Sequence, residues 1–190
     1  MSQNLSYDST RDVLLTLEHG EIRGADYLKI HHALMRYVHG VDRSNLELLR
    51  SAFWEEGTCN YSGKDEPAHL WAQNTLISLS SMERTHHAVA NFLIDFTGPD
   101  TAVVETYCTG YHLLYVGEER TLTDMIAGGR YLDNFQKRGT QWRILSRYYV
   151  MDWNTNVPAS RQGKDGRFER LNKGARMPDD AYYTVLRAGA

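Results

Sequence analysis

Three segments between residues 25 and 79 place their apolar positions with the period of an α-helix. A helix is predicted over residues 25–40, ended by Gly40, because its apolar positions fall on one helical face. A second helix is expected to begin at Ser44, with Glu47 in capping-box position. Pro67 is expected to start a third helix. The apolar face of the first helix is formed by Ile30, Leu34, Val38 and Val41.

After Met82 the pattern changes to a period of two, which is typical of strands. Gly128-Gly129 falls inside one predicted strand and indicates a bulge or bend. Together with a short strand at 57–63, the pattern predicts helices followed by an antiparallel meander, which is an α+β fold. The long strands are predicted at residues 84–96, 101–116, 120–137 and 141–153.

The periodic pattern covers only the middle of the chain. Residues 1–23 are interpreted as an N-terminal arm and residues 24–154 as the single domain. Residues 155–190 are rich in Gly, Arg, Lys and Asp. This segment is either a disordered tail or an arm that covers a pocket or a neighbouring subunit, and its aromatic residues favour the arm.

Charge and composition exclude several partners. Asp and Glu outnumber Lys and Arg by 24 to 21. The chain therefore lacks the excess of basic residues that is typical of a nucleic-acid-binding protein. No apolar run is long enough for a membrane span, and the first residues have no secretory pattern. Cys59 and Cys108 form no CxxC motif, which favours a cytoplasmic protein with reduced thiols. The open sheet face favours a homo-oligomer.

Asp42 and Tyr37 are the first candidates for chemistry. Asp42 follows the first helix, where a carboxylate is unfavourable against the helix dipole unless it serves the next helix or a partner such as histidine. Tyr37 lies five residues earlier. It either packs in the core or donates a proton to a substrate oxygen.

His86 and His87 open a predicted strand, so their side chains must point to opposite faces. His86 shares the parity of Ala88, Ala90, Phe92 and Ile94, which is the apolar face. Parity therefore favours His86 as the inward residue, with Asp42 fixing its tautomer, as in a general base. The small side chain of Ala88 would leave room for a substrate.

Other residues are expected to line the pocket or to serve the reaction. Arg147 on the last strand is either a surface residue or a binder of an anionic leaving group. Trp71 lies on the apolar face of the third helix. One parity of the second long strand carries Tyr107, Thr109 and Tyr111, and the other carries Cys108 and His112; parity does not decide which set faces inward.

The chain lacks the motifs of the common cofactors. It has no HExxH, no GxGxxG, no phosphate-binding loop and no GxSxG elbow. Adjacent strand histidines diverge and cannot clamp one metal ion. We therefore expect a site with neither metal nor cofactor.

Three segments together carry a family resemblance: "YVHGVDRSNLELLRSAF", "THHAVANFLIDFTGPDTAVVETY" and "GRYLDNFQKRGTQWRILSRYYVMDW". They resemble the SnoaL-like group of the nuclear transport factor 2-like superfamily. The resemblance implies a cone-shaped sheet wrapped around N-terminal helices and an oligomer, either a trimer or a dimer. The group includes scytalone dehydratase, bile-acid 7α-dehydratase and hexachlorocyclohexane dehydrochlorinase, which use an Asp–His dyad without cofactor. The resemblance places the dyad on Asp42 and His86 and further site residues on Tyr37 and Arg147.

The combined expectation is a cofactor-independent lyase that acts on a small hydrophobic molecule, aromatic or alicyclic, by dehydration or another elimination such as formaldehyde release. An isomerase or cyclase with the same base is the first alternative. The second is a non-catalytic ligand-binding protein, such as a ring-hydroxylase small subunit.

Overall fold

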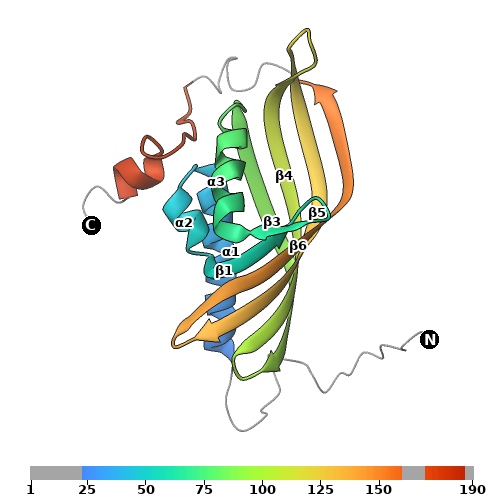
Figure 1. Ribbon diagram of the computed structural model, residues 1–190. Coiled ribbons are helices and arrows are strands. Elements are labelled where there is room, and N and C mark those ends of the chain that lie inside the picture. The colour runs from blue at the N-terminus through green and yellow to red at the C-terminus, as the bar shows by residue number, and fades with distance from the viewer. Residues whose placement is uncertain (1–22, 160–169, 187–190) are drawn as a thin grey trace, which may run out of the picture.

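Six strands form one strongly curved, open sheet, and the helices pack against its concave side (Figure 1). The computed structural model describes residues 23–159 and 170–186. The predicted N-terminal arm, apart from residue 23, therefore lies outside the described residues. The elements are α1 (Gly24–Asp42), α2 (Leu46–Arg50), β1 (Phe53–Asn60), β2 (Asp65–Pro67), α3 (Ala68–Leu79), β3 (Arg84–Gly98), β4 (Thr101–Val116), β5 (Thr121–Arg138), β6 (Gln141–Pro158) and a π-helical turn, Tyr182–Leu186.

The strand order is β2-β1-β6-β5-β4-β3, and only the pair β1–β6 is parallel. Strands β3 to β6 form the predicted antiparallel meander. The α+β class and the curved sheet with N-terminal helices are confirmed. β6 continues to Pro158, beyond the predicted domain end at residue 154.

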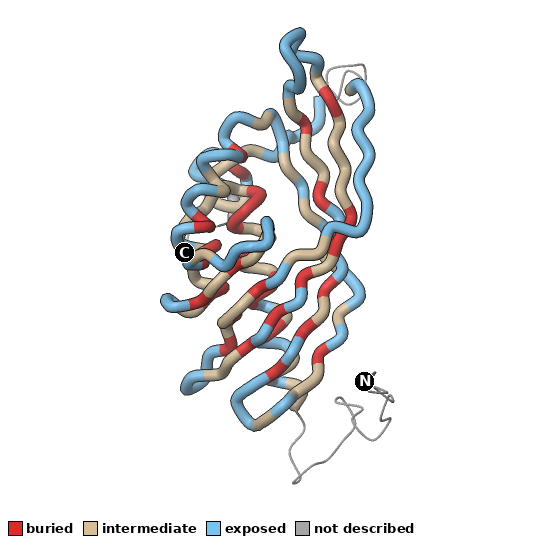
Figure 2. The backbone as a smooth tube through the Cα atoms, turned by 45° about the vertical axis from the view of Figure 1, so that its right-hand side comes forward, coloured by how far each residue is buried: buried red, intermediate tan, exposed pale blue. Residues whose placement is uncertain are grey.

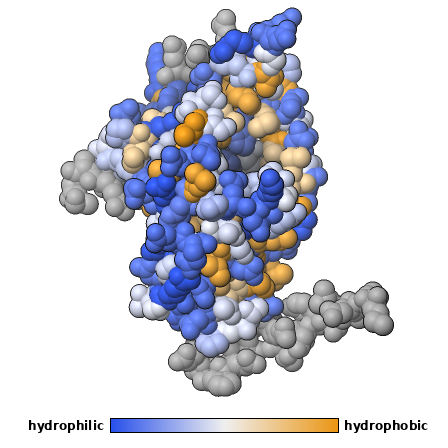
Figure 3. Space-filling model, viewed as in Figure 1, coloured by the Kyte–Doolittle hydropathy of each residue, from blue (hydrophilic) through white to orange (hydrophobic). Residues whose placement is uncertain are grey.

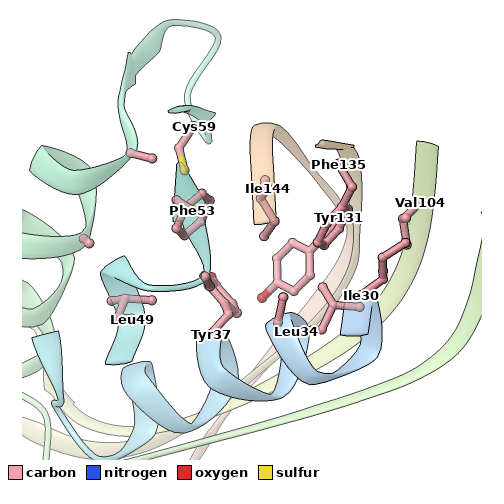
Figure 4. Packing of buried hydrophobic residues seen from close by; sticks show 14 of the residues in the cluster. Ile30, Leu34, Tyr37, Leu49, Phe53, Cys59, Val104, Tyr131, Phe135 and Ile144 are labelled. Carbon is pink, nitrogen blue, oxygen red and sulfur yellow. The ribbon is translucent and has the colours of Figure 1, made fainter. Parts of the chain in front are cut away.

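The core lies between α1 and the concave face of the sheet. Ile30, Leu34 and Tyr37 of α1 point towards inward-facing residues of β1, β4, β5 and β6 (Figure 4). The predicted apolar face of the helix is therefore its packing face. Ile30 and Leu34 are almost fully buried, and each such side chain contributes roughly 1.5–3 kcal/mol to folding.

α1 does not end at Gly40 as predicted; it continues to Asp42. Gly40 is needed for another reason. A Cβ at this position would lie 2.6 Å from the backbone nitrogen of Leu49, so only glycine lets α1 and α2 approach this closely. Asn45, rather than Ser44, caps α2, because its side chain accepts a hydrogen bond from the Leu48 N–H. The longer α1 places Asp42 against β3.

A β-bulge at Asn91 changes which residues of β3 face the core. Asn91 has φ +54°, and the register of β3 with β4 shifts between Ala90 and Phe92. Asparagine tolerates this left-handed conformation better than most residues. Because the bulge adds one residue, the inward parity is odd before it and even after it. Figure 2 shows the resulting alternation of burial along the strands.

The convex face of the sheet exposes large apolar side chains. Apolar residues gather along the side of the molecule where the strands lie (Figure 3). The expected oligomer that would cover this face stays a prediction. Among the described residues, no helix is long and apolar enough to cross a membrane. The exposed residues of this face include Leu93, Val103, Tyr107, Leu132, Tyr148 and Trp153.

Candidate active site

Asp42 and His87 form a hydrogen-bonded pair at the junction of α1 and β3. Asp42 Oδ1 lies 2.7 Å from His87 Nδ1, and Asp42 Oδ2 accepts a hydrogen bond of 2.8 Å from the His87 backbone N–H. Burial alone would raise the pKa of Asp42, but the hydrogen bonds and charge of His87 outweigh it and hold that pKa below its ordinary value. A carboxylate can only accept, so Nδ1 carries a proton and Nε2 is left with a lone pair in the neutral ring.

The prediction that His86 faces inward beside Asp42 is wrong. His86 is exposed, and His87 takes the inward position. The parity argument assumed unbroken alternation from His86 to Ile94, and the bulge at Asn91 breaks it. Ile94 is buried as expected, but the residues before the bulge are displaced by one.

His112 of β4 completes the polar inner surface, and sequence reasoning gave it no role. Its ring lies 5.1 Å from the His87 ring in an edge-on arrangement. Burial and the neighbouring His87 lower the pKa of His112 to about 4, so it is neutral near pH 7. Gly110 makes room for both rings, since a Cβ there would lie 3.0 Å from His112 Cε1 and 3.3 Å from His87 Nε2. The inward-facing residues of β4, which the sequence left undecided, are therefore those that share the face of Cys108 and His112.

A cluster of buried phenols continues the inner surface below the dyad. Tyr37 and Tyr61 share a hydrogen bond of 2.7 Å between their hydroxyls, and the Tyr131 hydroxyl lies 3.1 Å from Cys108 Sγ. Burial raises the pKa of the Cys108 thiol. Cys108 lies on β4 two residues before Gly110, which is paired with His87. Burial raises the pKa of Tyr37 to about 12 and those of Tyr61 and Tyr131 well above their ordinary value. All three phenols therefore remain protonated donors.

Arg147 lies in the core, with its charge already paired. Its guanidinium donates two hydrogen bonds, of 2.8 and 2.7 Å, to Asp133, and the side chains of both residues are fully buried. It also lies between the rings of Tyr37 and Tyr131, 4.1 and 3.9 Å from their centroids. Burial opposes its charge, but Asp133 outweighs burial and raises the pKa of Arg147 well above its ordinary value. The geometry favours a structural role over the predicted binding of a leaving group.

The predicted substrate-binding residues divide between the two faces. Trp71 is buried and stacks on Tyr61 at 4.6 Å, as expected for a pocket wall. Ala88, Tyr107 and Thr109 are exposed on the convex face, so their placement in the pocket was wrong: Ala88 because of the bulge in β3, and Tyr107 and Thr109 because the other parity of β4 faces inward. Tyr111 shares that parity and donates a hydrogen bond of 2.6 Å to Asp124. Tyr111 nevertheless lines a groove beside the Asp42–His87 pair.

This groove has a volume of about 510 Å³ and opens beside Asp42. One wall is formed by residues 83–86 of β3 and the turn before it, so the exposed His86 lines the groove mouth. The opposite wall is formed by residues 172–176 of the C-terminal segment. Asp42 is the member of the Asp42–His87 pair that lines this groove.

The C-terminal segment is attached to the helical layer by several polar contacts. Arg43 forms an ion pair of 3.7 Å with Asp180, and its carbonyl accepts a hydrogen bond from Met177 N. The Tyr183 hydroxyl lies within hydrogen-bond distance of His39 and Asn45. Arg176 donates to carbonyls at the end of α3. These contacts support the interpretation of residues 170–184 as an arm, and its role as a lid stays a prediction.

The described residues contain no group of three or more His, Cys, Asp and Glu side chains arranged to hold a metal ion. The acid–base groups of the site are one imidazole held by a carboxylate, one neutral imidazole and three protonated phenols.

Comparison with known proteins assigns the chain to a family. The model of the SnoaL-like domain matches residues 23–148, about two thirds of the chain. A search of the curated proteins found no match.

Solved structures share the fold at low sequence identity. A proposed scytalone dehydratase from Novosphingobium aromaticivorans has a TM-score of 0.61 and 21% identity, covering 71% of this chain and 89% of its own. The hexachlorocyclohexane dehydrochlorinase LinA-type3 from Novosphingobium barchaimii has a TM-score of 0.63 and 15% identity, covering 71% and 92%. A cystatin-like protein of unknown function from Nostoc punctiforme has a TM-score of 0.55 and 21% identity, covering 68% and 92%. At these identities the likeness shows the fold.

Proposed function

We propose, from the premise that this chain belongs to the SnoaL-like domain family, that it is a cofactor-independent lyase in which His87 is the general base. The observation that carries the proposal is the two-point contact of Asp42 with the ring and backbone of His87. It replaces the pairing of Asp42 with His86 that the sequence predicted.

His87 is suited to remove a proton from carbon or oxygen. Asp42 fixes the tautomer and stabilises the imidazolium that forms when Nε2 takes the proton. The carboxylate remains ionised near neutral pH because its pKa is lowered. A positioned base of this kind contributes typically about 10²–10⁴-fold to rate.

The departing group needs a proton donor on the same inner surface. Tyr37 and Tyr61 are protonated and linked to each other by a hydrogen bond, so one can donate while the other stabilises the phenolate. The neutral His112 beside His87 can donate a hydrogen bond to the leaving oxygen but keeps its own proton. In an elimination, His87 would remove a proton from one carbon, a C=C bond would form, and the leaving oxygen would depart with a proton from one of the two phenols.

The buried walls favour a small hydrophobic substrate. Tyr61 stacks between Trp71 and Tyr149, at 4.6 and 5.0 Å, and forms an aromatic surface against which a planar or alicyclic ring packs well. Two relatives of this fold are named for eliminations, a dehydratase and a dehydrochlorinase, which supports lyase chemistry over other acid–base reactions.

An isomerase remains the second candidate, because the same base with protonated phenols also suits proton transfer within one molecule. The observation that favours it is again His87, since the imidazolium formed at Nε2 can return the same proton to another atom of the substrate. The third hypothesis, a non-catalytic ligand-binding protein, does not account for the Asp42–His87 pair.

The proposed function is tested by incubating the protein with a panel of small alicyclic and aromatic alcohols and following product mass. A lyase changes the mass of its main product by the leaving group, whereas an isomerase does not. Turnover that is equal in wild type and in a folded His87→Ala variant would contradict both assignments.

A further inference from the structure

A second polar pocket lies on the side of α1 that faces away from the core, beside the β5–β6 hairpin (Figure 1). It has a volume of about 300 Å³. Lys29, His32 and Arg36 follow one another at spacings of three and four residues, so they share one helical face. Residues 140–142 form the opposite wall.

The charge of this pocket is positive and lacks a counterion among the described residues. No carboxylate of the described ranges forms an ion pair with Lys29, Arg36 or Arg143. The nearby Asp26 is already paired with Lys137 at 3.2 Å. Burial and the neighbouring charge of Arg143 both lower the pKa of Arg36. Such a local excess is notable because the whole chain has a formal charge of −3.

Two buried donors that line this pocket have no hydrogen-bond partner. They are Arg36 Nε and Trp142 Nε1, and Trp142 is only 1% exposed. A buried N–H without an acceptor is costly and rare in folded proteins. An acceptor that carries negative charge would satisfy both the two donors and the unpaired cations.

We propose that this pocket is an anion-binding site, separate from the Asp42–His87 site, which takes a compact oxyanion group such as the phosphate or carboxylate of a small metabolite. Arg36 and Trp142 donate hydrogen bonds to the anion from the pocket floor. Lys29 and His32 close over it from the exposed helix face. The chemistry is that of charge-assisted hydrogen bonding to an oxyanion.

The test is thermal unfolding of the full chain during titration with inorganic phosphate, and separately with acetate, at constant ionic strength. A bound anion raises Tm along a saturating curve, whereas general salt stabilisation does not saturate in the same range. Saturation with either anion supports the site, and the stronger of the two identifies the group it prefers. No saturation with either overturns the proposal.

Variants assign the effect to this pocket. Lys29→Gln changes an exposed side chain and should fold, and Arg36→Gln removes the buried donor; each should weaken binding by about tenfold or more. Lys64→Gln, an exposed lysine in the turn between β1 and β2, is the matched control and should bind as wild type. Equal saturation in all four proteins would place the anion elsewhere and overturn the proposal.

Discussion

Asp42 holds His87 at two points, the ring nitrogen and the backbone amide, with distances of 2.7 and 2.8 Å. One oxygen fixes the tautomer and the other fixes the position of β3 relative to the end of α1. The pair therefore joins the proposed general base to the architecture of the fold, since α1 extends past Gly40 and so places Asp42 against β3. Any shift of β3 by one residue would remove both bonds.

Gly110→Ala should reduce turnover without unfolding the protein. The added Cβ would lie 3.0–3.3 Å from the rings of His112 and His87, so both must move by a few tenths of an ångström. Displacement of a positioned base by about 1 Å costs on the order of 10²-fold, and we expect a smaller fall in kcat here. The measurement is kcat with the identified substrate. Urea unfolding of Gly110→Ala checks that the variant remains folded, and an unchanged kcat in Gly110→Ala would contradict the placement of the rings.

His112 should make stability depend on pH in mildly acidic solution. Its pKa is about 4 in the folded protein and close to its ordinary 6.5 in the unfolded chain. The unfolded state therefore binds a proton that the folded state does not, so stability falls as pH decreases from 6.5 towards 4. The measurement is the urea midpoint across this range for wild type and His112→Gln. The variant should show a shallower dependence, and His32→Gln, on the exposed face of α1, should keep the wild-type dependence.

Breaking the buried pair of Arg147 and Asp133 should destabilise the fold strongly. Arg147→Met leaves the Asp133 carboxylate buried and unpaired, which costs about 3–5 kcal/mol of unfolding free energy. The double variant Arg147→Met with Asp133→Leu should recover much of that loss, because no charge remains in the core. Urea unfolding measures both. The exposed pair of Arg130 and Asp152 is the control, and its removal should change stability far less.

The bulge at Asn91 should be sensitive to the backbone preference of its residue. Asn91→Val places a β-branched side chain at φ +54° and should cost about 1–3 kcal/mol of unfolding free energy. Asn91→Gly should be close to neutral, since glycine adopts this conformation readily. Asn91 is exposed, so equal effects of the two substitutions would show that contacts, rather than backbone conformation, determine the residue here.

Periodicity was sufficient for the helices and the four long strands, but not for the short strands or the inner face of β3: β1 begins at Phe53, before the strand expected at 57–63, and β2 was not predicted. The helices, the four long strands and the bulge at Gly128-Gly129 follow from local patterns, and the register of β5 with β6 shifts at that point. Asn91 carries no comparable signal, because a single asparagine in a strand is common. Its bulge reversed the choice between His86 and His87 and moved Ala88 to the convex face. Tyr107 and Thr109 lie there for a different reason, because β4 turns Cys108 and His112 inward, a choice that parity had left open.

Long-range pairing explains the other differences. Arg147 seemed available for an anion because nothing in its own strand shows that Asp133 of β5 lies opposite it. Likewise, the role of His112 depends on its contact with His87, twenty-five positions earlier in the chain, a contact made by strand register. A sequence pattern indicates which face of the sheet a residue prefers. The role of that residue depends on which side chain lies opposite it on the neighbouring strand.

The measurement that tests the central claim most directly compares His87→Asn with His86→Asn in one turnover assay. The two residues are adjacent, share the same chemistry and differ only in the face they occupy. We expect His87→Asn to lose about 10²–10⁴-fold in kcat/KM, whereas His86→Asn should stay within a few-fold of wild type. A loss confined to His86→Asn, with both variants folded, would contradict the account.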